Sequence, residues 1–362
     1  MEGIKKKISK RILKSIQCDI ITVPWKYSDN NLLKSKTNKM KTKIIISVLT
    51  IMFFTGFISY AKPSAEKNRF SKNTIYKDVE YKTILVDSLK IFYREAGETT
   101  KPTIILLHGF PSSSHMYRNL LNELANNYHV IAPDYPGFGQ SSAPTPQQYQ
   151  YTFDNLSITM EHFIDKLKIT KTSLYIQDYG GPVGLRIATR RPELIESLII
   201  QNANAYVEGL GEILKPLIAY IESPNEKTEK AARFFLTADA TKWQYLTGAE
   251  TPEKIAPDSF SIDQYYMDRQ GNDVIQLALF RDYGSNITLY EKWHQYFAKY
   301  KPPMLVIWGK NDQFFTAAGA SAYKKDNPKA EIHLLNGGHF ALEEHHLEIS
   351  KLIINFLSKK VK

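Results

Sequence analysis

Cysteine is nearly absent from this sequence of 362 residues, in which Cys18 is the single one. A chain with one cysteine forms no internal disulfide, so its stability must come from a hydrophobic core. With 43% apolar residues, the chain is long enough for one large domain with an insertion. We find no internal repeat and no spacing of His, Cys, Asp and Glu that is typical of a metal site, and we predict neither a metal nor a cofactor.

An excess of positive charge is absent beyond the N-terminal part of the chain. The first 43 residues contain twelve Lys or Arg against three acids, and this net charge of +9 accounts for most of the +10 of the whole chain. The remaining residues carry a net charge of only +1. Because a protein that neutralises several phosphates needs a basic face, we expect no nucleic-acid partner.

A stretch without charged residues extends over residues 44–60 and follows two lysines. A short basic segment, an apolar segment and small residues at its end are the pattern of a secretory signal peptide. We therefore predict a signal peptide at residues 40–61, with export to the periplasm or the medium and no membrane association after cleavage. The alternative is an uncleaved membrane anchor at residues 44–61, although seventeen mostly apolar residues are short for a hydrocarbon core of about 30 Å.

The segments on either side of this stretch have different compositions. Residues 1–39 have the composition of neither a folded domain nor a targeting segment. One interpretation is that Met40 is the true start and that the reading frame is extended upstream of it. Residues 62–77 are polar, and we predict a linker there.

From residue 78 onward, short apolar runs alternate with helical segments. This alternation is typical of an α/β fold with a mainly parallel sheet and helices on both faces. The pattern changes at about residue 205, where helical, aromatic-rich segments replace the apolar strand runs. We predict a core formed by residues 78–204 and 293–362, and a helical insertion formed by residues 205–292, which the family resemblance given below implies to be a cap over the carboxyl edge of the sheet.

Serine is missing from the place in this core where a hydrolase nucleophile is usually found. An apolar strand ends at residue 177, Asp178 follows, and Gly180 comes two residues later, before a helix. With Ile176 in the first position, this is the frame that places a nucleophile on a sharp strand-to-helix turn. A carboxylate needs no base for its activation, but its attack produces an ester that must then be hydrolysed. The acid therefore disfavours ordinary esterase chemistry and predicts a covalent ester on Asp178.

Two later loops supply the groups that hydrolyse such an ester. Asp312 follows the apolar run 304–309, and His339 lies in a glycine-rich loop after the run 331–335. Both loops follow strands and so lie at the edge where open α/β sheets place their ligands. The order nucleophile, acid, histidine also fits this architecture. We predict Asp178 as the nucleophile, His339 as the base toward water, and Asp312 as the group that orients the imidazole.

An upstream apolar run over residues 103–107 ends in the segment His-Gly-Phe-Pro. In this architecture the loop after that strand gives one N–H of the oxyanion hole, and the residue after the nucleophile gives the other. We assign these donors to the backbones of Phe110 and Tyr179. Each feature alone has an ordinary explanation as a turn, a helix cap or a loop histidine. Their occurrence in order, each at the end of a predicted strand, favours catalysis.

These segments together resemble the α/β-hydrolase fold family and, within it, the branch of epoxide hydrolases and haloalkane dehalogenases, which use an Asp nucleophile. The resemblance extends from about residue 78 to residue 359. It is carried by residues 108–111, a glycine turn at 134–141, the elbow at Asp178, and residues 308–312 and 338–340. It implies a hydrolase with an inserted cap and a small apolar electrophile as its substrate, and it leaves the oligomeric state open.

Two positions separate the activities of this branch. Both classes usually have Trp directly after the nucleophile, and dehalogenases hold the leaving halide with it; this chain has Tyr179 at that position. One dehalogenase group also uses an Asn where this chain has Phe110. Epoxide hydrolases need cap acids, usually two Tyr, to protonate the epoxide oxygen. The resemblance therefore implies opening of an epoxide to a diol, with haloalkane dehalogenation as the alternative and a catalytically silent binding protein as the alternative of another class. The cap candidates are Tyr283 and Tyr245 as proton donors, and Trp243 and Trp293 as halide donors.

Overall fold

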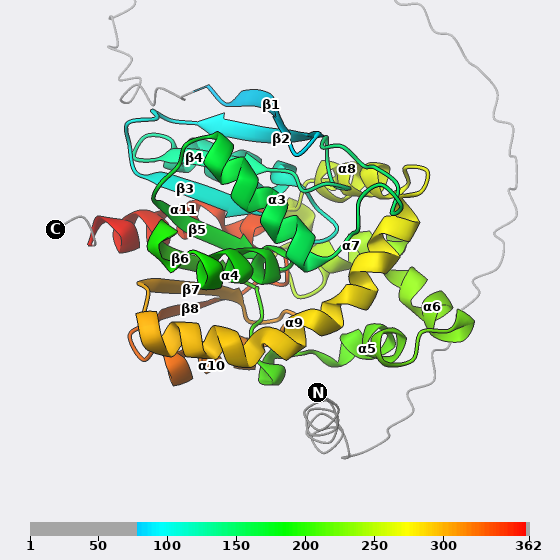
Figure 1. Cartoon of the computed structure of the whole chain (residues 1–362). Coiled ribbons are helices and arrows are strands. Elements are labelled where there is room, and N and C mark those ends of the chain that lie inside the picture. Colours follow the sequence, from blue (N-terminus) through cyan, green and yellow to red (C-terminus); the bar gives the residue numbers. More distant parts are fainter. Residues whose placement is uncertain (1–77, 360–362) are drawn as a thin grey trace, which may run out of the picture. The chain divides into compact units, whose positions relative to one another are not determined.

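The computed structural model describes residues 78–359, which contain a sheet in the order β1-β2-β4-β3-β5-β6-β7-β8 (Figure 1). The hairpin of β1 (Glu80–Val86) and β2 (Leu89–Ala96) is antiparallel, and β2 pairs antiparallel with β4 (His129–Pro133). All other neighbouring strands are parallel, namely β3 (Thr103–Leu107), β5 (Thr172–Gln177), β6 (Ile195–Gln201), β7 (Met304–Gly309) and β8 (Glu331–Leu335). The prediction of an α/β fold with a mainly parallel sheet is therefore confirmed.

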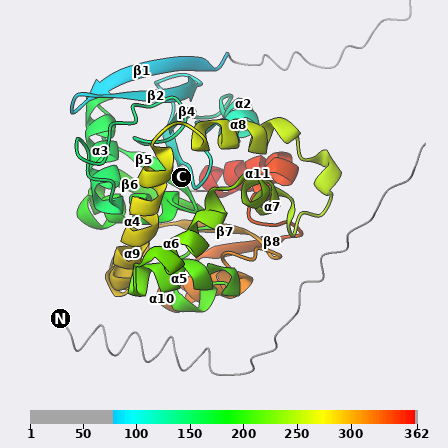
Figure 2. The ribbon, with the colours of Figure 1, turned by 90° about the vertical axis from the view of Figure 1, so that its right-hand side faces the viewer.

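Helices cover both faces of this sheet, with α3 and α4 on one side and α2 and α11 on the other (Figure 2). Alternate residues of β3 point to opposite faces of the sheet. Ile105 and Leu107 pack into one hydrophobic core, and Ile104 and Leu106 pack into the other. A strand that is buried on both faces must be apolar throughout, which is why its sequence does not alternate with polar residues. The helices that cover the sheet are α2 (Arg118–Leu124), α3 (Phe153–Lys166), α4 (Gly180–Arg190), α10 (Ala317–Asp326) and α11 (Ala341–Ser358).

The cap is a helical insertion between β6 and β7. It contains α5 (Lys215–Glu222), α6 (Glu226–Ala232), α7 (Ala238–Leu246), α8 (Pro257–Met267) and the start of α9 (Asn272–Tyr300). The predicted border at residue 292 is wrong, because it lies inside α9. This helix contains no proline and ends only at Lys301, in the left-handed region, before Pro302 and Pro303. The cap therefore continues into the core through one unbroken helix.

The predictions for residues 1–39, 40–61 and 62–77 lie outside the described residues. Within residues 78–359, no helix has the length and apolar character that are needed to cross a membrane.

Candidate active site

Asp178 lies on a sharp turn between β5 and α4, at the carboxyl end of the strand. Its φ of 47° is in the left-handed region, which Asp tolerates better than most residues. Two glycines make this turn possible. A Cβ atom on Gly180 would overlap the carbonyl oxygen of Leu107, and a Cβ atom on Gly109 would overlap the side chain of Asp178. The strand-to-helix elbow expected from the sequence is therefore present, with the acid at its tip.

The carboxylate of Asp178 is buried and hydrogen-bonded to the backbone. The N–H of Phe110 donates to its Oδ1 over 2.7 Å, and the backbone of Tyr179 donates to the same carboxylate. Burial raises the pKa of Asp178 above its ordinary value, while nearby His339 and the two backbone donors limit this rise. The two N–H groups assigned from the sequence thus converge on this acid.

His339 lies between two carboxylates. Its Nδ1 is 2.8 Å from Oδ2 of Asp312, and its Nε2 is 3.7 Å from Oδ2 of Asp178. Burial acts to lower the pKa of His339, but the negative charges of Asp312 and Asp178 outweigh this effect, so that its pKa is raised. The structure therefore brings together the three side chains that the sequence nominated from three separate loops.

Asp312 is fixed by hydrogen bonds from every side of its carboxylate. The backbone N–H groups of Phe314 and Phe315 donate to its Oδ1 over 2.7 and 3.1 Å, and Nδ2 of Asn202 donates to its Oδ2 over 2.7 Å. Asn202 follows β6 directly, and its Oδ1 accepts the N–H of Gly309. Our sequence reasoning missed Asn202. A polar residue directly after a buried parallel strand is the pattern that identifies it.

Gln177, the last residue of β5, also escaped our sequence reasoning. Its side chain is fully buried, and its Nε2 lies 3.3 Å from Nε2 of His339, while its Oε1 has no hydrogen-bond partner. An imidazole whose Nδ1–H donates a hydrogen bond to Asp312 carries a lone pair on Nε2. The amide N–H of Gln177 can donate to that lone pair. Gln177 therefore holds the imidazole at the atom that faces Asp178.

The loop before Phe110 is supported by a neutral histidine. Nδ1 of His108 lies 3.0 Å from the carbonyl oxygen of Gly109, and the N–H of Tyr135 donates to its Nε2 over 3.2 Å. Burial lowers the pKa of His108 to about 4, so the ring is neutral at ordinary pH. It holds the loop and does not reach the reacting groups.

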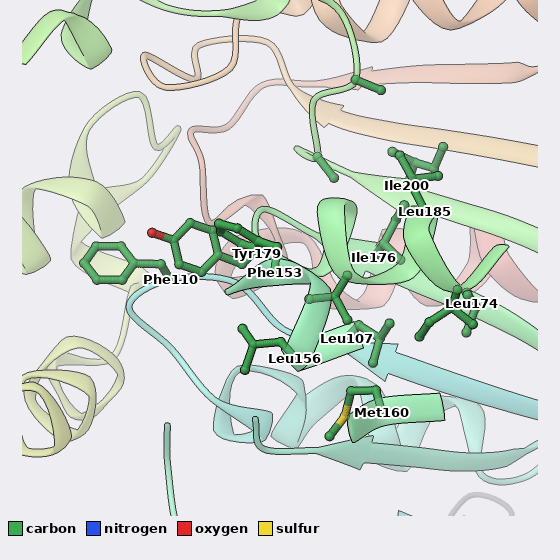
Figure 3. Close-up of a cluster of buried hydrophobic side chains, with 14 of the residues drawn as sticks. Leu107, Phe110, Phe153, Leu156, Met160, Leu174, Ile176, Tyr179, Leu185 and Ile200 are labelled. Atoms are coloured by element: carbon green, nitrogen blue, oxygen red, sulfur yellow. The ribbon is translucent and has the colours of Figure 1, made fainter. Parts of the chain in front are cut away.

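A pocket opens above Asp178 and His339 and is lined almost entirely by apolar side chains. Phe110, Tyr179 and Phe153 form an aromatic group at the end of the buried strands (Figure 3), in which Tyr179 packs edge-on against Phe153. The cap contributes aliphatic side chains from Leu214, α5 and α9 and two aromatic rings, namely Leu214, Leu217, Ile218, Ile221, Ile287, Phe235 and Phe280. The polar cap residues at this pocket are Tyr283 and Gln244.

Of the four cap candidates, only Tyr283 lines the pocket, and its hydroxyl group is hydrogen-bonded to that of Tyr290. Tyr245 is fully buried elsewhere, where its hydroxyl donates to Asp263 and its ring stacks on Phe340. The proposal of Tyr245 as a proton donor is therefore wrong.

Neither tryptophan lines the pocket. Trp243 packs edge-on against Phe314, and Trp293 is buried beside Tyr290. Successive residues of a helix point about 100° apart, so on α7 the side chain that faces the pocket is Gln244, and its neighbours on both sides face away. The two halide donors predicted from the cap are therefore wrong, and Gln244 is a pocket residue that sequence reasoning missed.

Within residues 78–359, no group of three or more His, Cys, Asp or Glu could hold a metal ion. The site itself consists of two carboxylates, an imidazole and backbone N–H groups. A mainly parallel sheet with a nucleophile elbow and an inserted cap defines a hydrolase of the α/β class. The model of the alpha/beta hydrolase fold family matches residues 102–346, and the chain belongs to this family.

Comparison with known proteins gives the same class. The chain is 39% identical to an uncharacterized hydrolase of Saccharomyces cerevisiae over 297 residues, which are 77% of this chain and 97% of the yeast protein. It is 38% identical to epoxide hydrolase 4 of Mus musculus over 122 residues, which are 34% of each chain. A solved haloalkane dehalogenase of Agrobacterium tumefaciens C58 has the same fold, with a TM-score of 0.66 at 24% identity over 78% of this chain and 97% of that one. The chain is therefore an enzyme of the α/β-hydrolase family, similar to epoxide hydrolases and haloalkane dehalogenases.

Proposed function

We propose that the protein hydrolyses an alkyl electrophile, an epoxide in the first place, through a covalent ester on Asp178. The observation that carries this proposal is the position of the Asp178 carboxylate. Its Oδ1 accepts the backbone N–H of Phe110, its Oδ2 faces His339 across 3.7 Å, and Asp178 lines an apolar pocket. In the first step Oδ2 attacks the substrate carbon, the carbon–oxygen bond of the epoxide breaks, and the alkoxide takes a proton from a pocket acid.

The second step is hydrolysis of this ester. His339 takes a proton from water, and the water oxygen attacks Cγ of Asp178. Negative charge then develops on Oδ1, where the N–H groups of Phe110 and Tyr179 stabilise it, and one such donor is worth about 3 kcal/mol of barrier. Asp312 holds the imidazole and stabilises its cation. The ester C–O bond breaks, the departing oxygen takes the proton from His339, and the diol leaves with an oxygen atom of the enzyme. The second proton of the water is released as the new carboxylic acid of Asp178 ionises, and it restores the pocket acid.

Tyr283 is the proposed acid for the epoxide oxygen. Burial raises the pKa of its phenol well above the ordinary value, so the group stays protonated until an alkoxide, which is a much stronger base, forms beside it. Neither nominated tryptophan lines the pocket, so the indole N–H donors expected for a departing halide are missing there, and this favours epoxide opening. Haloalkane dehalogenation remains the second candidate, since it uses the same nucleophile and the same ester.

A substrate panel tests this choice. We expect diol formation from terminal epoxides and weak halide release from bromoalkanes of the same length. Tyr283→Phe should lower epoxide turnover by roughly a hundredfold, the usual contribution of a positioned acid. Tyr265→Phe removes a phenol from the exposed face of α8 and should leave the rate unchanged. Bromide release well above epoxide turnover would instead favour the dehalogenase.

A further inference from the structure

Gln244 is a polar side chain at an apolar pocket, and its Nε2 has no hydrogen-bond partner among residues 78–359. It is only 2% exposed, lines the same pocket as Asp178 and His339, and its Nε2 is buried without a hydrogen bond. A buried amide N–H that is left unpaired costs free energy, and a hydrogen-bond acceptor that enters the pocket would recover it.

Another buried glutamine of the cap provides the contrast. Gln276 on α9 is also fully buried and also has one unpaired amide atom, its Oε1. Its Nε2, however, donates to Oδ1 of Asn272 over 3.4 Å, and Gln276 does not line the pocket. Gln244 therefore differs in facing the space that the substrate occupies.

The surroundings of Gln244 define the kind of ligand. The pocket is lined by Asp178 and His339 and by apolar side chains of the cap, aliphatic ones from α5 and both aliphatic and aromatic ones from α9. A pure hydrocarbon chain would leave the amide unpaired, whereas an oxygen atom in the chain would accept its N–H. The amide of Gln244 can present either its N–H or its C=O to the substrate, because a half-turn about its last bond exchanges donor and acceptor.

We infer that Gln244 is a substrate-recognition residue that hydrogen-bonds an ether or ester oxygen carried by the substrate beside its electrophilic carbon. The preferred substrates are then glycidyl ethers and esters with an alkyl tail rather than hydrocarbon epoxides. This inference rests on the proposed function. It follows the rule that a site built to hydrogen-bond a substrate group discriminates against the analogue without that group, because its own polar atoms are then left unpaired.

A matched pair of epoxides tests the inference. Butyl glycidyl ether and 1,2-epoxyoctane have the same chain length and differ by one ether oxygen in place of a methylene, and glycidyl butyrate adds a carbonyl one bond farther along. We expect the wild-type enzyme to prefer the oxygenated substrates by about tenfold in kcat/KM, as one net hydrogen bond allows. Gln244→Met should abolish this preference by slowing the oxygenated substrates alone. Gln276→Met is the matched control and should retain the preference.

Three outcomes contradict the inference. The first is equal turnover of all three epoxides by the wild-type enzyme, a result that requires no variant to fold. The second is an equal loss for all three in Gln244→Met, which indicates a structural role. The third is an unchanged preference in Gln244→Met together with loss of bromide release from 1-bromooctane, which assigns the amide to a halide.

The failure of the proposed function is a separate result. If His339→Gln protein gains no mass on Asp178 with any of the three epoxides, the ester mechanism is wrong, and the inference fails with it. If the ester forms with all three at equal rates, only the role of Gln244 is wrong.

Discussion

Nδ1 of His339 lies 2.8 Å from Oδ2 of Asp312, although 27 residues separate them in the chain. The carboxylate holds a proton on Nδ1, so Nε2 is the basic atom of the ring, and it lies on the side of Asp178. A base in this position can act on water only after an ester has formed on Asp178. The two steps of the proposed reaction should therefore respond differently to substitutions in this pair.

Substitution of the base should trap the intermediate. In His339→Gln the nucleophile is intact but no base activates water, so an ester should accumulate on Asp178. Intact mass spectrometry after addition of an epoxide should show a gain of one substrate mass, or of the alkyl group alone for a halide. His333→Gln changes a partly exposed histidine on β8 that pairs with Glu331, and it should behave as wild type. A fully active and unmodified His339→Gln protein would rule out this role.

Substitution of the orienting acid should slow the second step alone. Asp312→Asn removes the charge that fixes the Nδ1 proton, and in the comparable Ser enzymes such a change lowers kcat by roughly 10⁴-fold. Rapid-quench measurement should show a normal rate of ester formation followed by slow hydrolysis. Asn202→Ala, which removes one of the donors to Asp312, should have the same effect in weaker form. An equal decrease in both steps would mean that Asp312 supports the whole site and not the base.

The pH dependence of ester hydrolysis should report on the same pair, His339 and Asp312. Ester hydrolysis needs neutral His339, and its pKa is raised chiefly by the charge of Asp312 against the opposing effect of burial. The rate of this step should thus fall as pH decreases through the pKa of His339, which Asp312 still raises in the ester although Asp178 carries no charge there. In Asp312→Asn the pKa of His339 should decrease, and the midpoint of the profile should move to lower pH. A midpoint that stays in place would show that another group titrates.

The elbow should tolerate no side chain at Gly180. A Cβ atom there would overlap the carbonyl oxygen of Leu107 on the neighbouring strand, and backbone cannot move aside as a flexible side chain can. We expect Gly180→Ala to lower the free energy of unfolding by about 2–3 kcal/mol, in the range of overpacked cores. Gly271→Ala is the control, since its Cβ would meet no atom within 4 Å and only its φ of 80° is unfavourable. Urea denaturation compares the two, and equal midpoints would contradict the packing argument.

The sequence predicted the elements around the site better than the cap. Short apolar runs that end in glycine or acid have sharp borders, so the strands at 304–309 and 331–335 have the predicted bounds. The loops after them carry Asp312 and His339 to the edge where Asp178 lies, because parallel strands align their carboxyl ends.

The cap side chains could not be predicted in the same way. Trp243, Gln244 and Tyr245 are consecutive, and the rotation of α7 against the core decides which one enters the pocket. Composition favoured the aromatics, but the helix presents the amide. Asn202 and Gln177 belong to no recognised motif, and their contacts depend on how β5 and β6 pack beside the loop of His339.

One measurement tests the ester on Asp178 most directly. In a single turnover in water enriched in oxygen-18, water attacks Cγ of the ester and not the substrate carbon. We expect the label in the carboxylate of Asp178, detected in the peptide that contains it, and a diol whose new oxygen came unlabelled from the enzyme. Label in the diol and none in Asp178 after the first turnover would mean that the carboxylate acts only as a base, and the covalent mechanism would be wrong.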